Sequence, residues 1–177
     1  MVKTSLTASH FVHFDALASG LDGARKAAKP RAMSGAPRTL EDIAEEYLFL
    51  DGDERYLLLI ELGRELDDMP AALKTDATLV RGCSASFWVY PMARGDDDGG
   101  GVSLHFLADS NAAITKGIVA LVIAAVQDRP ASEVAACDIA AALAPFDLKN
   151  QLSSNRTQGV PNMIALIRET AARFAGD

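Results

Sequence analysis

Residues 87–107 read FWVYPMARGDDDGGGVSLHFL, and this stretch separates two halves of the chain that both have helical periodicity. Its first four residues are β-branched or aromatic and favour a strand, and Pro91 predicts a sheet edge or a strand end. Its last six residues alternate, which predicts a second, half-buried strand. Glycines and aspartates over 95–101 predict a mobile hairpin turn. With a further short strand expected over 78–81, the sequence predicts a small antiparallel sheet of three strands.

Two helices are expected before this sheet. Thr39, with Asp42 three residues later, has the pattern of a helix N-terminus, and that helix should end at residues 51–53. A second helix is expected over about 53–66. Its 56–60 run is apolar nearly all round, so this helix should lie within the core rather than on the surface.

Helical periodicity returns after the sheet. Asp109 or Ser110 is expected to cap a buried helix that includes the apolar run 117–126, which is far shorter than the roughly 20 residues of a membrane span. Ser132 is expected to cap a short helix, and Pro161 to open a C-terminal amphipathic helix. This order of elements predicts a single α+β domain.

The 177 residues carry a formal net charge of −7, which is unevenly distributed. Residues 1–38 carry a net charge of +4, and residues 39–177, the predicted domain, carry −11. A domain that acidic repels a phosphate backbone, so nucleic-acid binding is not expected. The hydrophobic share of 49% and the charged share of 23% are values typical of globular proteins.

Residues 1–38 are basic and rich in Ala, Ser and Gly, and three interpretations of them stay open. They resemble an organelle transit peptide in charge, they suit an interaction arm, and they suit a disordered extension. We favour the disordered extension, which would not be translated if Met33 is the true start. The domain itself is expected in the cytoplasm.

The sequence contains few candidate catalytic or metal-binding residues. The three histidines do not cluster, and His105 with Cys83 would supply two metal ligands at best, so we expect no metal site. We expect His105, on a strand, to be solvated. No phosphate-binding or dinucleotide glycine pattern occurs, and Ser153-Ser154 lacks a nucleophile elbow.

The two cysteines differ in their surroundings. Cys83 follows Arg81 and Gly82 in a loop-forming stretch of small residues, where the arginine would favour the thiolate. Cys137 lies in an apolar helical context that is typical of an inert thiol. From the residues alone, Cys83 is either a reactive thiolate or a buried structural thiol.

Four segments resemble the SufE family of sulfur-acceptor proteins. RGCSASFWV at 81–89 is similar to the active loop of that family, and ADSNAAITKGIVALV at 108–122 to the start of its buried helix. LSSNRTQGVPNMIALI at 152–167 resembles its Ser-Arg and Gln-Gly segment, and DGDERYLLLIELGREL at 51–66 its second helix. The four segments occur in the family's order with compatible spacing.

The resemblance implies a SufE/IscU-like fold and a defined chemistry. Cys83 would take persulfide sulfur from a PLP-dependent, SufS-like cysteine desulfurase, stimulate that enzyme, and pass the sulfur to an iron–sulfur scaffold. The implied active loop also contains Arg81, Gly82 and Ser84. The implied partner contact or surrounding surface contains Asp109, Lys116, Arg156 and Gly159. The chain itself would bind no PLP, iron–sulfur cluster or metal. From the charge and the short apolar run, neither nucleic acid nor a membrane is expected as a partner.

The sequence departs from the family pattern beside the thiol and at the start of the buried helix. Ala85 and Ser86 replace the usual Ser and Gln, Phe87 replaces an aliphatic residue, and Asn111 replaces an Asp. Other functions stay open, namely sulfur delivery to tRNA thiolation or molybdopterin synthesis, thiol redox chemistry, a non-catalytic interaction domain, and a relative that has lost its rate.

Overall fold

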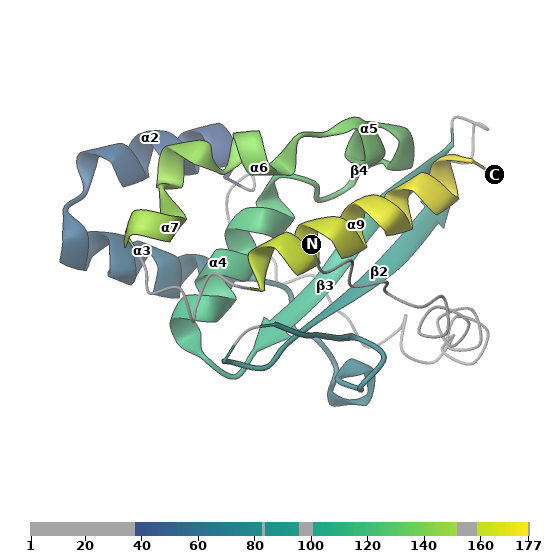
Figure 1. Cartoon of the computed structure of the whole chain (residues 1–177), viewed down its shortest axis with the longest axis horizontal. Coiled ribbons are helices and arrows are strands. Elements are labelled where there is room, and N and C mark those ends of the chain that lie inside the picture. The colour runs from purple at the N-terminus through teal and green to yellow at the C-terminus, as the bar shows by residue number, and fades with distance from the viewer. Residues whose placement is uncertain (1–37, 83, 96–100, 152–158, 177) are drawn as a thin grey trace, which may run out of the picture.

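The computed structural model describes residues 38–82, 84–95, 101–151 and 159–176, and Figure 1 shows their arrangement. Two helices precede a twisted antiparallel sheet, and a series of helices follows it. The described helices are α2 (Leu40–Phe49), α3 (Gly52–Glu65), α4 (Ala113–Ala124), α5 (Ala131–Ala136), α6 (Ile139–Ala142), α7 (Leu148–Gln151) and α9 (Val160–Ala175), with 3-10 turns η2 (Ala71–Leu73) and η3 (Ala144–Phe146). The strands are β1 (Leu79–Val80), β2 (Phe87–Gly95), β3 (Val102–Ser110) and β4 (Arg129–Pro130).

Local capping sets the starts of α2 and α3. The Thr39 side chain accepts a hydrogen bond from the backbone N–H of Asp42, and the Asp42 carboxylate accepts one from the backbone N–H of Thr39. Asp51 and Glu54 form the same reciprocal pair at the start of α3. Each pair satisfies two backbone donors that a helix N-terminus would leave unbound. The two predicted helices are thereby confirmed within a residue of their expected limits.

The sheet has the order β1-β2-β3-β4, and all its neighbours are antiparallel. β1 pairs with β2 only as far as residue 88, so Pro91 lies at a free edge, where its missing N–H breaks no ladder bond. The α+β class is therefore confirmed, and the sheet has a fourth strand beyond the three predicted. β4 has two residues, one of them a proline, and so gives no alternating signal.

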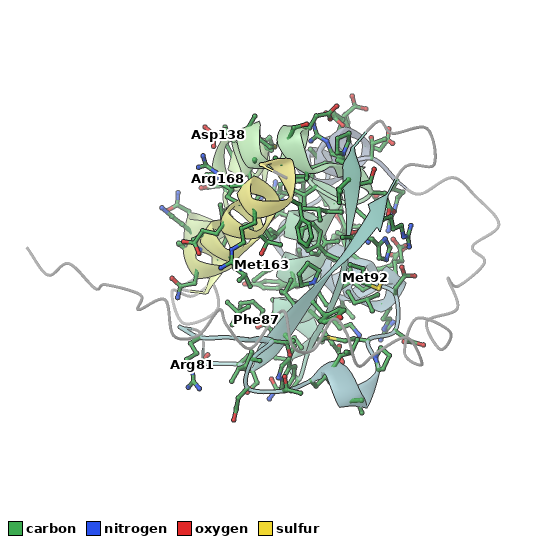
Figure 2. The ribbon with its side chains drawn as sticks, turned by 90° about the vertical axis from the view of Figure 1, so that its right-hand side faces the viewer. Arg81, Phe87, Met92, Asp138, Met163 and Arg168 are labelled. Carbon is green, nitrogen blue, oxygen red and sulfur yellow. The ribbon has the colours of Figure 1, made fainter. Side chains whose placement is uncertain are left out.

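Both faces of the sheet are covered. On one face, Phe87, Val89 and Phe106 join the main core with α4 and α9. On the other face, Trp88, Tyr90 and Met92 pack with three buried residues, Met69, Leu73 and Leu107. Figure 2 shows Met163 of α9 and Met92 on opposite sides of the sheet. The prediction of a half-buried second strand is thus wrong: the segment before β1 covers the face that was expected to meet solvent.

Two glycines allow α3 and α4 to cross in close contact. A Cβ on Gly117 would lie 2.0 Å from the backbone oxygen of Leu59, and a Cβ on Gly63 would lie 3.0 Å from the backbone nitrogen of Gly117. Neither position has room for a larger residue without movement of a backbone. The crossing fixes the first half of α4, which includes Lys116, against α3.

The start of α4 differs from the prediction. Strand β3 continues through Ser110, so neither Asp109 nor Ser110 is the N-cap, and α4 begins at Ala113. Ser110 still accepts a hydrogen bond, from the backbone N–H of Ala112. Residues 109 and 110 stay extended rather than cap the helix because they pair with Trp88 and Phe87 of β2.

The remaining helices surround the core. α5 begins after Pro130, so Ser132 lies within the helix and does not cap it. α9 packs against α5 and has Pro161 in its first turn, as predicted. The apolar helix α4 is almost wholly buried, also as predicted. No helix among the described residues combines the length and apolar character needed to cross a membrane.

Candidate functional site

The predicted site is centred on the connection from β1 to β2. Cys83 itself and Arg156 lie outside the described residues, as do the tip of the predicted hairpin turn (96–100) and residues 1–37. Arg81, Gly82 and Ser84, on either side of Cys83, are exposed. Figure 2 shows Arg81 at the margin of the molecule with its side chain directed outward. The described part of the site consists of the residues that bind the two ends of this connection through hydrogen bonds.

The upstream end is held by the C-terminal helix. The side-chain amide of Asn162, in the first turn of α9, donates a hydrogen bond of 2.7 Å to the backbone oxygen of Arg81. Gly82 follows with φ of +104°, a conformation that L-residues with a side chain rarely adopt. The first turn of α9 and a glycine of positive φ thus define the backbone directly before residue 83.

The downstream end is held by the residues that join β3 to α4. The backbone N–H of Ser86 donates to Oδ1 of Asn111 at 3.1 Å, and the backbone N–H of Asn111 donates to the Ser86 oxygen at 3.1 Å. The hydroxyl of Ser110 donates to the same oxygen at 3.0 Å. Four residues therefore separate the two anchored positions, Arg81 and Ser86.

Asp109 lies beside the downstream anchor and joins three elements. Its carboxylate binds Nζ of Lys116 on α4 at 2.8 Å, and also Nζ of Lys74 after η2. Burial alone would raise the pKa of the Asp109 carboxyl, but hydrogen bonds from Lys116, Lys74 and the Ser110 backbone outweigh it and hold that pKa below its ordinary value. Asp109 and Lys116, which the sequence predicted as site residues, are thus bound to each other.

Gly159 is buried and stands immediately before α9. Its backbone oxygen accepts from the N–H of Met163, so it begins the hydrogen bonding of that helix. Because Asn162 lies in the same turn, the start of α9 determines where the Arg81 anchor can form. Gly159 is therefore linked to the β1–β2 connection through the helix that it begins.

The sequence reasoning missed three contributors to these anchors: Lys74, Ser110 in its bonding role, and Asn162. Asn162 lies within the 152–167 segment, but no periodicity marks it as different from other exposed helix residues. Lys74 is 35 positions from its partner Asp109. Only the assembled fold brings these residues together, because each bond joins elements that are far apart in the sequence.

His105 is not solvated, contrary to the prediction. It is 6% exposed, with Nδ1 2.8 Å from Asp128 and Nε2 3.3 Å from Asp67. The reason is the covered second face of the sheet, where His105 lies beside the 67–74 segment. Within the described ranges, no three His, Cys, Asp or Glu side chains converge as metal ligands would.

Cys137 ends α5 and is partly buried. Its sulfur lies 3.9 Å from Nη1 of Arg129, which also donates to the backbone oxygen of Ala125. Cys137 therefore lies at the end of a helix, beside an arginine that is bound to the backbone. The short connection after β1, fixed at both ends and exposed on its flanks, is the better place for a thiol that exchanges with a second macromolecule.

Comparison with known proteins gives consistent matches. The family model described as SufE, Fe-S metabolism associated domain, matches residues 41–171. An uncharacterized SufE-like protein of Rhizobium etli is 36% identical over 134 residues, which are 75% of this chain and 89% of that protein. One of Rhizobium meliloti is 34% identical, over 75% of this chain and 94% of that protein.

Two further matches extend the comparison. The cysteine desulfuration protein SufE of Wigglesworthia glossinidia brevipalpis is 29% identical over 119 residues, covering 67% of this chain and 79% of that protein. The solution structure of a hypothetical protein from Thermus thermophilus superposes with a TM-score of 0.61 at 15% identity, covering 81% of this chain and all of the other. That likeness supports the fold.

Proposed function

This chain belongs to the SufE family, and from that premise we propose that Cys83 accepts sulfur from a PLP-dependent cysteine desulfurase and that the chain stimulates that enzyme. The family is associated with iron–sulfur metabolism, and one relative is named as a cysteine desulfuration protein. An acceptor of sulfur for iron–sulfur cluster assembly fits both descriptions.

The proposed reaction is a thiol exchange. The Cys83 thiolate attacks the outer sulfur of the persulfide on the desulfurase cysteine. A bond forms between the Cys83 sulfur and that outer sulfur, the original S–S bond breaks, and the desulfurase cysteine leaves as a thiolate. The transferred sulfur keeps its oxidation state, so the step needs no external oxidant or reductant.

The surroundings of residue 83 support such a reaction. Arg81 is two positions from Cys83 in the sequence and is exposed, and a cation close to a cysteine favours its thiolate form. Hydrogen bonds hold the connection at Arg81 and at Ser86, with four residues between them. The observation that carries the proposal is this short connection, fixed at both ends, at the family's acceptor position.

The other sequence-predicted residues receive roles as supports. Asp109 and Lys116 hold the end of β3 that carries the Ser86 partners, and Gly159 begins the helix that reaches Arg81. We place Arg156 at the contact with the desulfurase or in the surface around the loop, as the family pattern implies. Ser84 belongs to the active loop itself. PLP belongs to the desulfurase, and the cluster forms on a downstream scaffold.

Asn111, which replaces the family's Asp, still supplies a hydrogen-bond acceptor. The Ser86 N–H needs an acceptor oxygen, and an amide oxygen supplies it as a carboxylate oxygen does. The amide lacks the negative charge of a carboxylate, and that charge would disfavour a thiolate nearby.

A thiol that cycles through a persulfide needs a reducing compartment, so the proposal places the reaction in the cytoplasm.

The test is the turnover of the desulfurase from the same organism, measured as alanine released from cysteine with and without this protein. The wild type and Cys137→Ser are expected to raise turnover equally. Cys83→Ser is expected to give no increase, because the persulfide then has no acceptor. Equal stimulation by Cys83→Ser and the wild type would contradict the proposal.

A further inference from the structure

Three large apolar side chains are mainly exposed among the described residues, and all three lie at one end of the molecule. Leu48 is 62% exposed, Phe49 is 91% exposed and Leu57 is 66% exposed. A phenylalanine presents a surface of about 150–250 Å², so Phe49 alone leaves a considerable apolar area in water. Together they form what we call the hairpin tip: Leu48, Phe49 and Leu57.

The hairpin tip lies where α2 turns into α3. Leu48 and Phe49 are the last two residues of α2, and Leu57 lies in the second turn of α3, about 8 Å along its axis from the helix start. Figure 1 shows this turn at the left edge, beyond the end of the sheet and far from α9. Clustered apolar exposure of this kind marks interaction surfaces more often than scattered exposed residues do.

Acidic residues surround the hairpin tip. Residues 41–57 contain seven carboxylates and one arginine. The exposed carboxylates nearest the turn are those of Glu45, Glu46, Asp51, Asp53 and Glu54. The arginine, Arg55, is turned inward: its Nε donates to the Tyr47 oxygen at 3.2 Å, and its guanidinium lies 4.8 Å from the centre of the Tyr47 ring.

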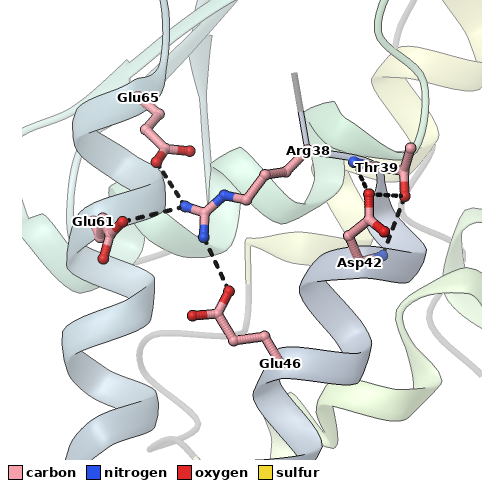
Figure 3. Close-up of polar contacts among 6 residues, drawn as sticks. All are labelled: Arg38, Thr39, Asp42, Glu46, Glu61 and Glu65. Atoms are coloured by element: carbon pink, nitrogen blue, oxygen red, sulfur yellow. Dashed lines mark hydrogen bonds and ion pairs between the residues drawn. The ribbon is translucent and has the colours of Figure 1, made fainter. Parts of the chain in front are cut away.

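Arg38, which precedes the start of α2, is also occupied. It binds Glu46 at 3.0 Å, Glu65 at 2.6 Å and Glu61 at 3.5 Å, between α2 and α3 (Figure 3). Three carboxylates thus share one guanidinium. Of the exposed acids near the turn, Arg38 pairs with Glu46 alone. The hairpin tip is an apolar surface in a negative field.

This combination selects the kind of occupant. A second copy of the chain would bring the same negative charge to the contact, and anionic lipid or nucleic acid would be repelled as well. An apolar pocket rimmed by Lys and Arg on a protein fits both properties, since an aromatic anchor fills the pocket and the acids meet the rim.

A short series of contacts leads from the hairpin tip to the β1–β2 connection. Leu57 is two residues from Leu59, whose backbone contacts Gly117 on α4. Gly117 lies in the first half of α4, and Asn111, two residues before α4 begins, binds Ser86. A standard interface covers about 800 Å² on each partner and so spans several elements of a small domain.

We propose that the hairpin tip docks the cysteine desulfurase, as a contact separate from the loop that accepts sulfur. This inference rests on the proposed function for the identity of the partner. Phe49 enters an apolar pocket on the desulfurase, and the surrounding acids pair with its basic rim. The contact contributes affinity and association rate, whereas the chemistry stays at Cys83.

The test measures the Kd for the purified desulfurase of the same organism, and the transfer rate at saturating desulfurase. Phe49→Ser and, separately, Leu57→Ser are expected to raise Kd about tenfold or more and to leave the saturated transfer rate unchanged. Both side chains are exposed, so the melting temperature should match the wild type. Glu45→Lys should also raise Kd, most strongly at low salt, whereas the matched charge reversal Glu169→Lys on α9 should not.

The outcomes separate this inference from the proposed function. If the wild type accepts sulfur but all three hairpin variants bind with the wild-type Kd, the docking contact is wrong and the sulfur acceptor stands. If the wild type binds the desulfurase but accepts no sulfur, the proposed function is wrong. If sedimentation shows a wild-type dimer that Phe49→Ser disperses, the occupant is a second copy and the docking proposal is overturned.

Discussion

Asn111 connects the end of β3 to the loop that precedes β2. Its side-chain oxygen accepts from the Ser86 backbone, and its own backbone donates in return, so a single residue closes a two-way hydrogen-bonded link. Ser110 adds a third bond to the same carbonyl oxygen. The downstream end of the β1–β2 connection is therefore held at Ser86 by a small number of bonds, and one substitution can remove each of them.

Removing the Asn111 acceptor should loosen the loop. Asn111→Ala leaves the Ser86 N–H without its partner, at a cost of about 1 kcal/mol, or about fivefold in an opening equilibrium. We expect Cys83 to be alkylated by iodoacetamide about fivefold faster in this variant. Asn111→Asp should keep the acceptor and react no faster than the wild type. Equal rates for Asn111→Ala and the wild type would show that this bond does not restrain the loop.

Asp109 gives the fold a defined dependence on pH. Its pKa is lower in the folded state, so its ion pairs contribute stability above the unfolded pKa of about 4, and this contribution is lost as the pH falls through the folded pKa. Asp109→Asn should lower the free energy of unfolding by about 1–2 kcal/mol at pH 7. The difference from the wild type, measured by urea denaturation, should shrink below pH 4. A difference that stays constant from pH 7 to pH 3 would contradict this role.

At the scale of elements, the crossing of α3 and α4 determines where the site forms. Gly63 and Gly117 let the helix backbones meet, and α4 then carries Lys116 to Asp109. The pattern that predicts a buried helix does not show which residue touches its neighbour. Sequence reasoning therefore identified the helix but not the reason for its glycine.

Gly117→Ala should be among the most damaging single methyl additions in the described chain. The new Cβ would lie 2.0 Å from the Leu59 oxygen, which a backbone shift alone can relieve, and overpacking of this kind costs about 1–3 kcal/mol or more. Gly52→Ala serves as the control because nothing lies within 4 Å of its Cβ. Urea denaturation should show a lower midpoint for Gly117→Ala alone. Equal midpoints would mean that the helices do not cross this closely.

Local patterns predicted most of the secondary structure, because caps and periodicity act between residues a few positions apart. The caps at Thr39 and Asp51 are such cases. His105 and Asp109 show the limit. Burial of His105 depends on a segment far earlier in the sequence that covers the sheet, and Asp109 remains in a strand because β2 pairs with it. Tertiary contacts override local preference at both positions.

The same limit applied to the candidate site. The residues around Cys83 were predicted from a family resemblance, and the structure adds the anchors of the loop, which no local pattern contains. Asn162 reaches Arg81 across 81 positions of sequence. Contacts of that separation follow from the packing of α9 and from nothing in its own sequence.

At the scale of the whole molecule, the distribution of negative charge is consistent with the proposed docking surface. The negative charge that argues against nucleic-acid binding is concentrated on α2 and α3, where the exposed hairpin tip also lies. The proposed chemistry lies at the β1–β2 connection, which α4 and α9 hold. The proposed docking surface and the proposed sulfur-accepting loop thus lie on different elements, so a substitution in one can leave the other unchanged.

The central claim is that Cys83 carries the sulfur, and one measurement tests it most directly. The wild-type protein is incubated with the desulfurase and cysteine, digested with trypsin, and the peptide of residues 82–94 is weighed. We predict a gain of one sulfur atom, about 32 Da, on this peptide and none on the peptide that contains Cys137. A peptide 82–94 of unchanged mass, in the presence of a desulfurase that is turning over, would contradict the account.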